Sequence, residues 1–384
     1  MYKIIAFTSL LALTSALPQR NRGGRQGGGR QGGGQTQQQQ ATAFQQAAQV
    51  PQGVSQAQDG STILDDTVMV NNLPIRFKIS APADQFLTTS GVPGAAATSA
   101  NGTMGANVLL HGDGGQSFFD FPNQNIQANT MGVVLLAPDE NLFWGGGSGL
   151  DRTDGVAHAQ AVSDFITTEM PKIVAMDASA VVFTGVSGGS LLMSGFFIPA
   201  QMQNFPNSAV ELNCGAMPPQ VQFADAATVM TQTKIHYQST TGELALLQDA
   251  IPQAIVAYEQ LAADAGLSAA QVNQLQTVDN SPNGGHCEFD GKDFVSGVQT
   301  MLTSYSNVMQ GGDGTVAGLG APSNGVVTTG VVGNENLQFV AGRKRNAASK
   351  SMLQMRWAQA EVVEDTDFQL LECDRASCGD EPRA

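Results

Sequence analysis

Charged side chains are scarce in this sequence, where they make up 13% of the residues against about a quarter in an ordinary globular chain. Lysine and arginine together number 18 and the acidic residues 33, so the formal net charge is −15. A negative chain repels nucleic acids and anionic membrane surfaces. We therefore expect no nucleic-acid partner and no membrane partner.

Long apolar runs are missing beyond the N-terminus. The first run, from Ile4 to Leu13, is too short to cross a bilayer, follows Lys3, and precedes small residues ending at Ala16. This pattern predicts a signal peptide over residues 1–16. No later stretch is typical of a transmembrane helix, so we expect a secreted, extracellular protein.

Cysteine is also rare. The four cysteines are Cys214, Cys287, Cys373 and Cys378; no C-x-x-C is present and the four histidines are scattered. We therefore expect no structural zinc site and no other metal. An even cysteine count in an exported chain indicates disulfides, for which three pairings exist. We favour Cys214 with Cys287 and Cys373 with Cys378.

Composition divides the chain into four segments. After the signal peptide, residues 17–60 are rich in Gly, Gln and Arg and are expected to be disordered. Residues 61–310 are long enough to form a single folded domain. Residues 311–384 are expected to form a low-complexity, acidic tail, in which the Arg343–Arg345 triplet is either a protease site or a solvated charge cluster. In an exported protein, Asn101-Gly102-Thr103 is a glycosylation acceptor.

Short apolar runs alternate with helix-compatible stretches across the folded segment. Two strands are expected around the Asn71-Asn72 turn. Five further strands are expected at 107–112, 132–138, 180–185, 209–215 and 234–239, with helices at 155–174, 188–200, 251–265 and 292–309. Near-continuous apolar runs indicate strands buried on both faces. The sequence therefore predicts a three-layer α/β sandwich with a mostly parallel central sheet.

One strand-to-helix junction carries a candidate nucleophile. The stretch "AVVFTGVSGGSLL" places Ser187 between an apolar strand and a helix, within a G-x-S-x-G pattern. The pattern alone is weak in a chain with 44 glycines, but strand–turn–helix is the setting in which a catalytic serine is exposed on a sharp turn. A neutral serine also needs a base and an oxyanion stabiliser.

A base and an acid are expected later in the chain. His286 lies in the turn-rich stretch "NSPNGGHCEFDG", whereas His236 falls in a strand and His158 in a helix, so His286 is the preferred base. For the acid, Glu243 follows the strand at 234–239, and Asp249 is the alternative, although it could instead cap the next helix. Asp279 is a third choice and is more typical of a turn.

The oxyanion hole is expected to combine two backbone N–H groups. One belongs to Gly188, the residue after the nucleophile, and the second comes from a loop after an early strand. In "NVLLHGDGGQ" the strand ends at His111-Gly112, so Asp113 or Gly114 would donate, and we assign Asp113.

Taken in order, "HGDGG", "GVSGG" and "GGHCEFD" resemble the α/β-hydrolase superfamily over residues 62–309. Within it, the pattern resembles secreted fungal serine esterases and polyester-depolymerase-type enzymes. The resemblance implies that Ser187 attacks an acyl carbon, His286 transfers the proton and Glu243 orients His286, although family members more often carry Asp as the acid.

Two functions follow from these motifs. The preferred one is a secreted serine hydrolase that cleaves small-molecule or polymeric esters without a cofactor. The alternative is a non-catalytic extracellular binding or surface protein of the same fold, which the Gln/Gly-rich head and the cysteine-bearing tail favour because they are typical of attachment segments. Convergence of Ser187, His286 and a carboxylate would distinguish the two.

Overall fold

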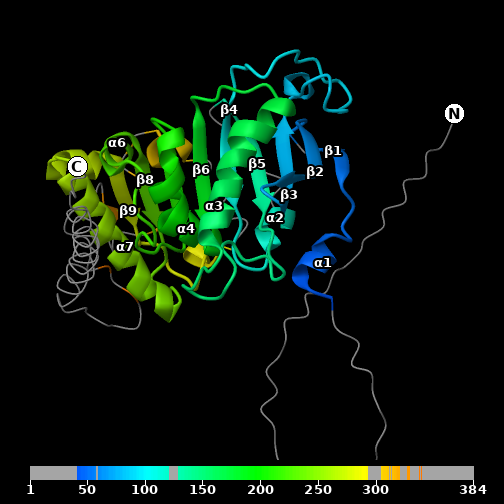
Figure 1. The fold of residues 1–384 in the computed structure, drawn as a ribbon. Coiled ribbons are helices and arrows are strands. Elements are labelled where there is room, and N and C mark those ends of the chain that lie inside the picture. Colours follow the sequence, from blue (N-terminus) through cyan, green and yellow to red (C-terminus); the bar gives the residue numbers. More distant parts are fainter. Residues whose placement is uncertain are drawn as a thin grey trace, which may run out of the picture. The chain divides into compact units, whose positions relative to one another are not determined.

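A ten-stranded sheet forms the centre of the fold (Figure 1). The computed structural model describes residues 41–57, 59–120, 129–292, 304–310, 312, 314–320, 327–328, 337 and 339. In chain order the strands are β1 (Gly53–Gln56), β2 (Thr62–Val70), β3 (Leu73–Ala81), β4 (Gly105–Leu110), β5 (Thr130–Leu136), β6 (Val181–Val186), β7 (Ala209–Asn213), β8 (Lys234–Gln238), β9 (Gln276–Asp279) and β10 (Val327–Thr328).

The strands lie in the spatial order β1-β2-β3-β5-β4-β6-β7-β8-β9-β10. The six central strands, from β5 to β9 in that order, are parallel, and the strands at both edges pair antiparallel. Parallel strands place their carboxyl ends along one edge of the sheet, where an α/β fold collects its functional loops.

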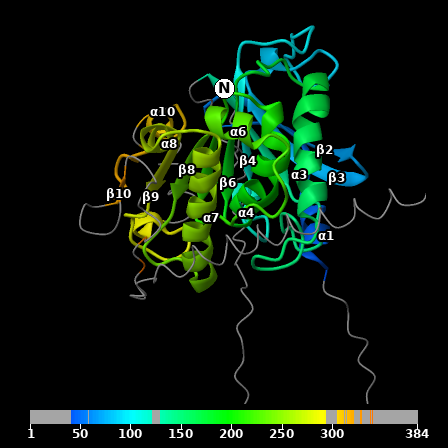
Figure 2. The ribbon, with the colours of Figure 1, turned by 60° about the vertical axis from the view of Figure 1, so that its left-hand side comes forward.

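Helices cover both faces of the sheet. Figure 2 shows α3 (Gly155–Asp164), α4 (Gly188–Leu192) and α7 (Ala245–Asp264) along one face. The other described helices are α1 (Ala43–Ala47), α2 (Gln116–Asp120), α5 (Ile198–Gln201), α6 (Ala226–Gln232), α8 (Ala269–Leu275) and α10 (Tyr305–Val308). The predicted three-layer α/β arrangement with a mostly parallel sheet is confirmed.

Side chains alternate between two cores along the central strands. In β5, Val133 and Leu135 join the large core beneath α3, α4 and α7, whereas Val134 and Leu136 join a smaller core that includes α1 and Phe118. All four side chains are buried. Burial on both faces explains why these strands are near-continuous apolar runs in the sequence.

The β2–β3 hairpin has the expected turn. Asn71 and Asn72 adopt φ values of 51° and 65°, the left-handed conformation that a two-residue hairpin turn requires and that asparagine tolerates. Ser268 and Gln271 form a capping box at the start of α8.

The prediction that residues 17–60 are disordered is wrong for the part that the structure describes. Thr42 and Gln45 form a capping box that starts α1, and β1 pairs antiparallel with β2. The buried guanidinium of Arg76 donates to the Ala47 carbonyl, 2.7 Å away. Composition did not show this contact because its donor lies about 30 residues further along the chain. Residues 1–40, with the predicted signal peptide, lie outside the described residues.

The helix predicted from Ile251 begins earlier, at Ala245, so that Pro252 lies inside α7 rather than in its first turn. Packing of Leu247, Ala250 and Ile251 into the core stabilises this extra length. Proline in a helix interior removes one backbone hydrogen bond, and the buried apolar face offsets that cost.

The expected boundary at residue 310 is also wrong. Val316 and Leu319 are buried against the core that contains Phe289 and Tyr305, and β10 extends the sheet beyond β9. Of the helix predicted at 292–309, the structure describes α10. Arg343–Arg345, Cys373 and Cys378 lie outside the described residues. No described helix is long and apolar enough to span a bilayer.

Candidate active site

Ser187 occupies the sharp turn between β6 and α4. Its backbone angles, φ 49° and ψ −111°, are unfavourable for a residue with a side chain and cost on the order of 1–3 kcal/mol. Its N–H donates to the Asn213 carbonyl at the end of β7, 2.9 Å away. The turn therefore points the serine hydroxyl out from the carboxyl edge of the sheet, as a nucleophile requires.

Close packing explains two glycines beside Ser187. A side chain at Gly188 would overlap the Asp113 carboxylate, and one at Gly189 would overlap the Leu110 carbonyl at the end of β4. Helix α4 can therefore begin against the ends of β4 and β6 only with glycine at these positions.

His286 links Ser187 to Glu243. The distance from His286 Nε2 to Ser187 Oγ is 2.8 Å, and that from His286 Nδ1 to Glu243 Oε2 is 2.7 Å. A carboxylate accepts hydrogen bonds, so Nδ1–H donates to Glu243, and the Nε2 lone pair accepts from the serine hydroxyl. The Glu243 side chain is fully buried, while that of His286 is 24% exposed. The imidazole is therefore partly accessible from solvent, whereas its carboxylate partner is not.

The loop that carries His286 is held by several contacts. Thr240 Oγ1 donates to the Gly285 carbonyl at 2.9 Å. A disulfide joins Cys287, the next residue, to Cys214, which follows β7. This is the pairing that the sequence analysis favoured, and it ties the histidine loop to the edge of the sheet that carries Ser187.

The two ring nitrogens of His286 contact Glu243 and Ser187, not the other candidate acids. Asp249 is an exposed residue of α7. Asp279 ends β9 and accepts hydrogen bonds from the backbone and hydroxyl of Ser281; its burial raises its pKa. It acts as a turn residue.

The remaining histidines have structural partners. His236 Nδ1 lies 2.9 Å from Thr277 Oγ1 inside the sheet, and burial lowers the His236 pKa to about 4. His158 accepts from the Gly145 N–H at 2.8 Å. His111 accepts from the Ala137 N–H at 2.9 Å, and burial lowers its pKa to about 4 as well. Neutral His111 therefore supports the loop that follows β4.

Two backbone N–H groups lie close to Ser187. Gly188 is the first residue of α4, so its N–H has no acceptor within the helix. The backbone nitrogen of Asp113 lies 3.2 Å from where a Cβ of Gly188 would stand. Adjacent N–H donors beside a serine nucleophile are the elements of an oxyanion hole.

Sequence reasoning missed Arg152. Its buried guanidinium binds both carboxylate oxygens of Asp113 at 2.8 Å. Asp113 was singled out for its backbone alone, and nothing local in the sequence connects it to a residue 39 positions later. Trp144, in the loop that carries Arg152, is fully buried and packs against His111 and His158.

Cys214, Cys287 and His286 have ligand-type atoms within 4.8 Å of one another. The two sulfurs are joined to each other, whereas a metal binds the thiolate form of cysteine. In this oxidised form the group does not fit a metal site.

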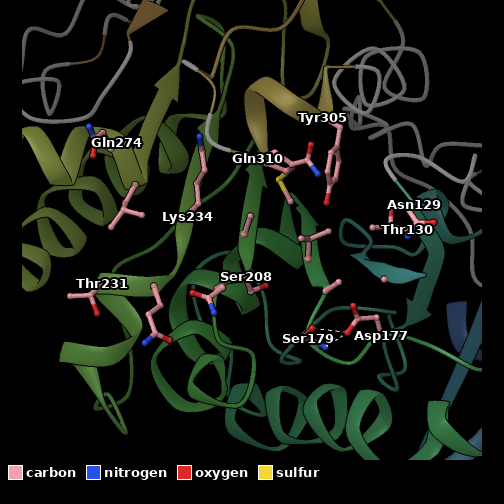
Figure 3. Close-up of a pocket in the computed structure, with 18 of the residues that line it drawn as sticks. Asn129, Thr130, Asp177, Ser179, Ser208, Thr231, Lys234, Gln274, Tyr305 and Gln310 are labelled. Carbon is pink, nitrogen blue, oxygen red and sulfur yellow. Dashed lines mark hydrogen bonds between the residues drawn. The ribbon is translucent and has the colours of Figure 1, made fainter. Parts of the chain in front are cut away.

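A separate cavity of about 810 Å³ opens where the parallel strands begin (Figure 3). Its lining includes Ser179, Ser208, Lys234 and Tyr305. Ser187 lies at the other end of β6, so roughly 16 Å of strand separates the two places. The cavity is therefore not part of the Ser187 site.

No family model matches this chain, and no curated protein matches it. Among solved structures, it is similar to a cold-adapted esterase from an Arctic intertidal metagenomic library, with 12% identity over 66% of this chain and 95% of that one and a TM-score of 0.37. It is also similar to a ferulic acid esterase, with 12% identity over 63% and 96% of the two chains and a TM-score of 0.39. A thermostable esterase gives 13% identity, coverages of 64% and 60%, and a TM-score of 0.41.

These similar structures are esterases by name.

Proposed function

We propose that this protein is a serine hydrolase that cleaves carboxylic esters by acyl transfer through Ser187. The observation that carries the proposal is the continuous chain of short hydrogen bonds from Ser187 Oγ through the His286 ring to Glu243. A histidine oriented by a buried carboxylate can accept the serine proton as the hydroxyl attacks.

The reaction has two halves. Ser187 Oγ forms a bond with the ester carbonyl carbon while its proton moves to His286 Nε2, and the negative carbonyl oxygen is stabilised by the N–H groups of Gly188 and Asp113. The bond to the alcohol oxygen then breaks, and His286 returns the proton to that oxygen. Water then attacks the acyl carbon while its proton moves to His286. The bond from the acyl carbon to Ser187 Oγ breaks, His286 returns the proton to Oγ, and the acid is released.

Glu243 stabilises the imidazolium that forms in each half. Because Glu243 is buried, its hydrogen bond with Nδ1–H is shielded from water. An ion-paired hydrogen bond is stronger in the protein interior than in water. The proposed chemistry needs no cofactor or metal ion. Its substrates would be small-molecule or polymeric esters.

Secretion is part of the proposal and has two supports. The Cys214–Cys287 disulfide is of a kind that persists in oxidising compartments. Asn101 is exposed, so a glycan could be attached there during export.

The test is labelling with a fluorophosphonate probe, comparing the wild type with Ser187→Ala. The probe reacts with serine hydroxyls that a neighbouring base activates. We expect the wild type to be labelled and to hydrolyse esters, and the variant to do neither while it keeps the wild-type circular dichroism spectrum. A folded wild type that resists labelling would favour the non-catalytic binding protein instead.

A further inference from the structure

Arg152 is a buried cation beside the proposed oxyanion hole that the acyl-transfer steps do not use. It lies in the loop between β5 and α3, and its side chain is 1% exposed. Nη1 and Nη2 each donate to one oxygen of Asp113 at 2.8 Å, and Nη1 also donates to the Trp144 carbonyl at 3.1 Å. Both carboxylate oxygens of Asp113 are therefore bound by a single guanidinium.

The position of Asp113 makes this ion pair consequential. Its backbone N–H is the second proposed oxyanion donor, and its carboxylate lies against Gly188, whose N–H is the first. A carboxylate is a strong acceptor for an unpaired backbone N–H. If the Asp113 side chain rotated onto the Gly188 N–H, it would fill the oxyanion hole with negative charge.

We propose that Arg152 is a positioning residue for the oxyanion hole, an inference that rests on the proposed function. Its two-pronged bond keeps the Asp113 carboxylate off the Gly188 N–H and holds the Asp113 N–H beside it. Both donors then stay available for the carbonyl oxygen of the substrate. Lysine could not reproduce this bidentate contact, because an ammonium group lacks the two parallel N–H donors with which a planar guanidinium binds both carboxylate oxygens.

The loop around Arg152 is built to hold the guanidinium still. Trp144, whose carbonyl accepts from Arg152, is fully buried. The Gly145 N–H donates to His158 in α3 at 2.8 Å. Gly145 itself has a φ of 81°, and a side chain there would meet the Cβ of Arg152 at 2.9 Å. Asp113 and the Trp144 carbonyl thus hold the guanidinium, and α3 holds the loop at Gly145.

Stability alone does not account for this ion pair. Arg152 Nε is buried without a hydrogen-bond partner among the described residues. Replacing a buried ion pair by apolar side chains is often neutral or stabilising. We therefore expect the contribution of Arg152 to appear in catalysis.

Arg76 provides a matched control. It is likewise buried and binds both oxygens of one aspartate, Asp65, at 2.8 and 2.9 Å, with a further bond to a backbone carbonyl. This pair joins β2 to β3. Its hydrogen bonds among the described residues do not involve Ser187, His286 or Asp113. Arg76→Met removes a buried arginine–aspartate ion pair of the same kind at a position on which catalysis should not depend.

The experiment compares wild type, Arg152→Met, Arg152→Lys, Arg76→Met and the double variant Arg152→Met/Asp113→Ala. The concentration of reactive Ser187 is titrated with the fluorophosphonate, and kcat per titrated site, KM and Tm are measured on a soluble ester. For Arg152→Met we expect kcat per site to fall about 100-fold, the scale of losing one oxyanion donor, with KM within about threefold. For Arg152→Lys we expect a smaller loss.

The double variant separates positioning from general loss of structure. Alanine at position 113 keeps the backbone N–H and removes the carboxylate, so we expect roughly tenfold more activity per site than for Arg152→Met. Arg76→Met is expected to change Tm and leave kcat per site unchanged. If Arg152→Met keeps the wild-type kcat per site, or the double variant regains nothing, the positioning role is wrong while the hydrolase proposal stands. A wild type without a reactive serine would overturn both.

Discussion

His286 holds two hydrogen bonds that determine which of its nitrogens carries the proton. Glu243 Oε2 accepts from Nδ1–H, and Nε2 is left to accept from Ser187. The second carboxylate oxygen, Glu243 Oε1, is buried without a hydrogen-bond partner among the described residues. The bond to His286 is therefore the main polar contact of this carboxylate, and the orientation of the imidazole depends on it.

We predict that Glu243→Gln lowers kcat by roughly 10²–10⁴-fold with little change in KM. A glutamine amide can donate to Nδ1 and so favours the tautomer in which Nε2–H faces Ser187, which cannot accept the serine proton. Steady-state kinetics on a soluble ester measures the effect.

Asp249→Asn is the matched control, since this carboxylate is exposed on α7. We expect its kinetics to equal those of the wild type. Equal losses in both variants, or a loss only in Asp249→Asn, would remove Glu243 from the proposed site.

At the scale of single elements, β7 carries an unusual buried acid. Glu211 pairs in register with His236 of β8, and Tyr305 of α10 lies near it. Glu211 Oε1 has no hydrogen-bond partner among the described residues. Burial raises the Glu211 pKa from 4.5 to about 7, because desolvation disfavours the charged form.

This shift predicts that Glu211 lowers the free energy of unfolding as the pH rises. The unfolded chain releases the Glu211 proton near pH 4.5, whereas the folded chain keeps it to about pH 7. The free energy of unfolding therefore falls as the pH rises between these values, by up to about 3 kcal/mol.

In Glu211→Gln this fall is absent. We expect the urea midpoint of the variant to gain on that of the wild type from pH 4.5 to pH 8. The lowered pKa values of His111 and His236 act in the opposite direction, but they are present in both proteins and cancel in the difference. A difference between the two midpoints that stays constant with pH would contradict the shifted pKa.

At the scale of the whole molecule, the Cys214–Cys287 disulfide joins distant parts of the chain covalently. It spans a sequence separation of 73 residues, which contains α6, β8, α7, α8 and β9. The covalent link constrains this part of the chain in the unfolded state, and in the folded chain it joins the histidine loop to the strand next to Ser187.

We predict that Cys214→Ser/Cys287→Ser lowers the free energy of unfolding by about 4 kcal/mol, from the loop entropy that the cross-link removes. Urea unfolding followed by tryptophan fluorescence measures the change. Wild type treated with a thiol reductant should shift to the same midpoint, and the variant should not respond to the reductant. Equal midpoints for oxidised wild type and variant would mean that the cross-link does not stabilise the fold.

Much of the fold follows from sequence patterns that extend over only a few consecutive residues. Apolar runs located five of the six central strands, all but β9. Asn71-Asn72 located the hairpin, and Gly185–Gly189 located the turn at Ser187. Such signals act locally, because backbone conformation and strand burial depend on neighbouring residues. The order of Ser187, Glu243 and His286 along the chain followed from the same signals.

Contacts between distant segments were decided only by the tertiary structure. Glu243 lies in the loop after β8, and Asp249 lies six residues later in α7. The local pattern favoured Glu243 but left Asp249 open, and only the folded chain brings the Glu243 carboxylate to His286. The same holds for two other contacts. Arg76 donates to the Ala47 carbonyl in α1, and Arg152 binds the Asp113 carboxylate; neither pair shares a local sequence pattern. A hydrogen bond requires two atoms within about 3 Å, and sequence spacing does not determine that distance once a strand or helix intervenes.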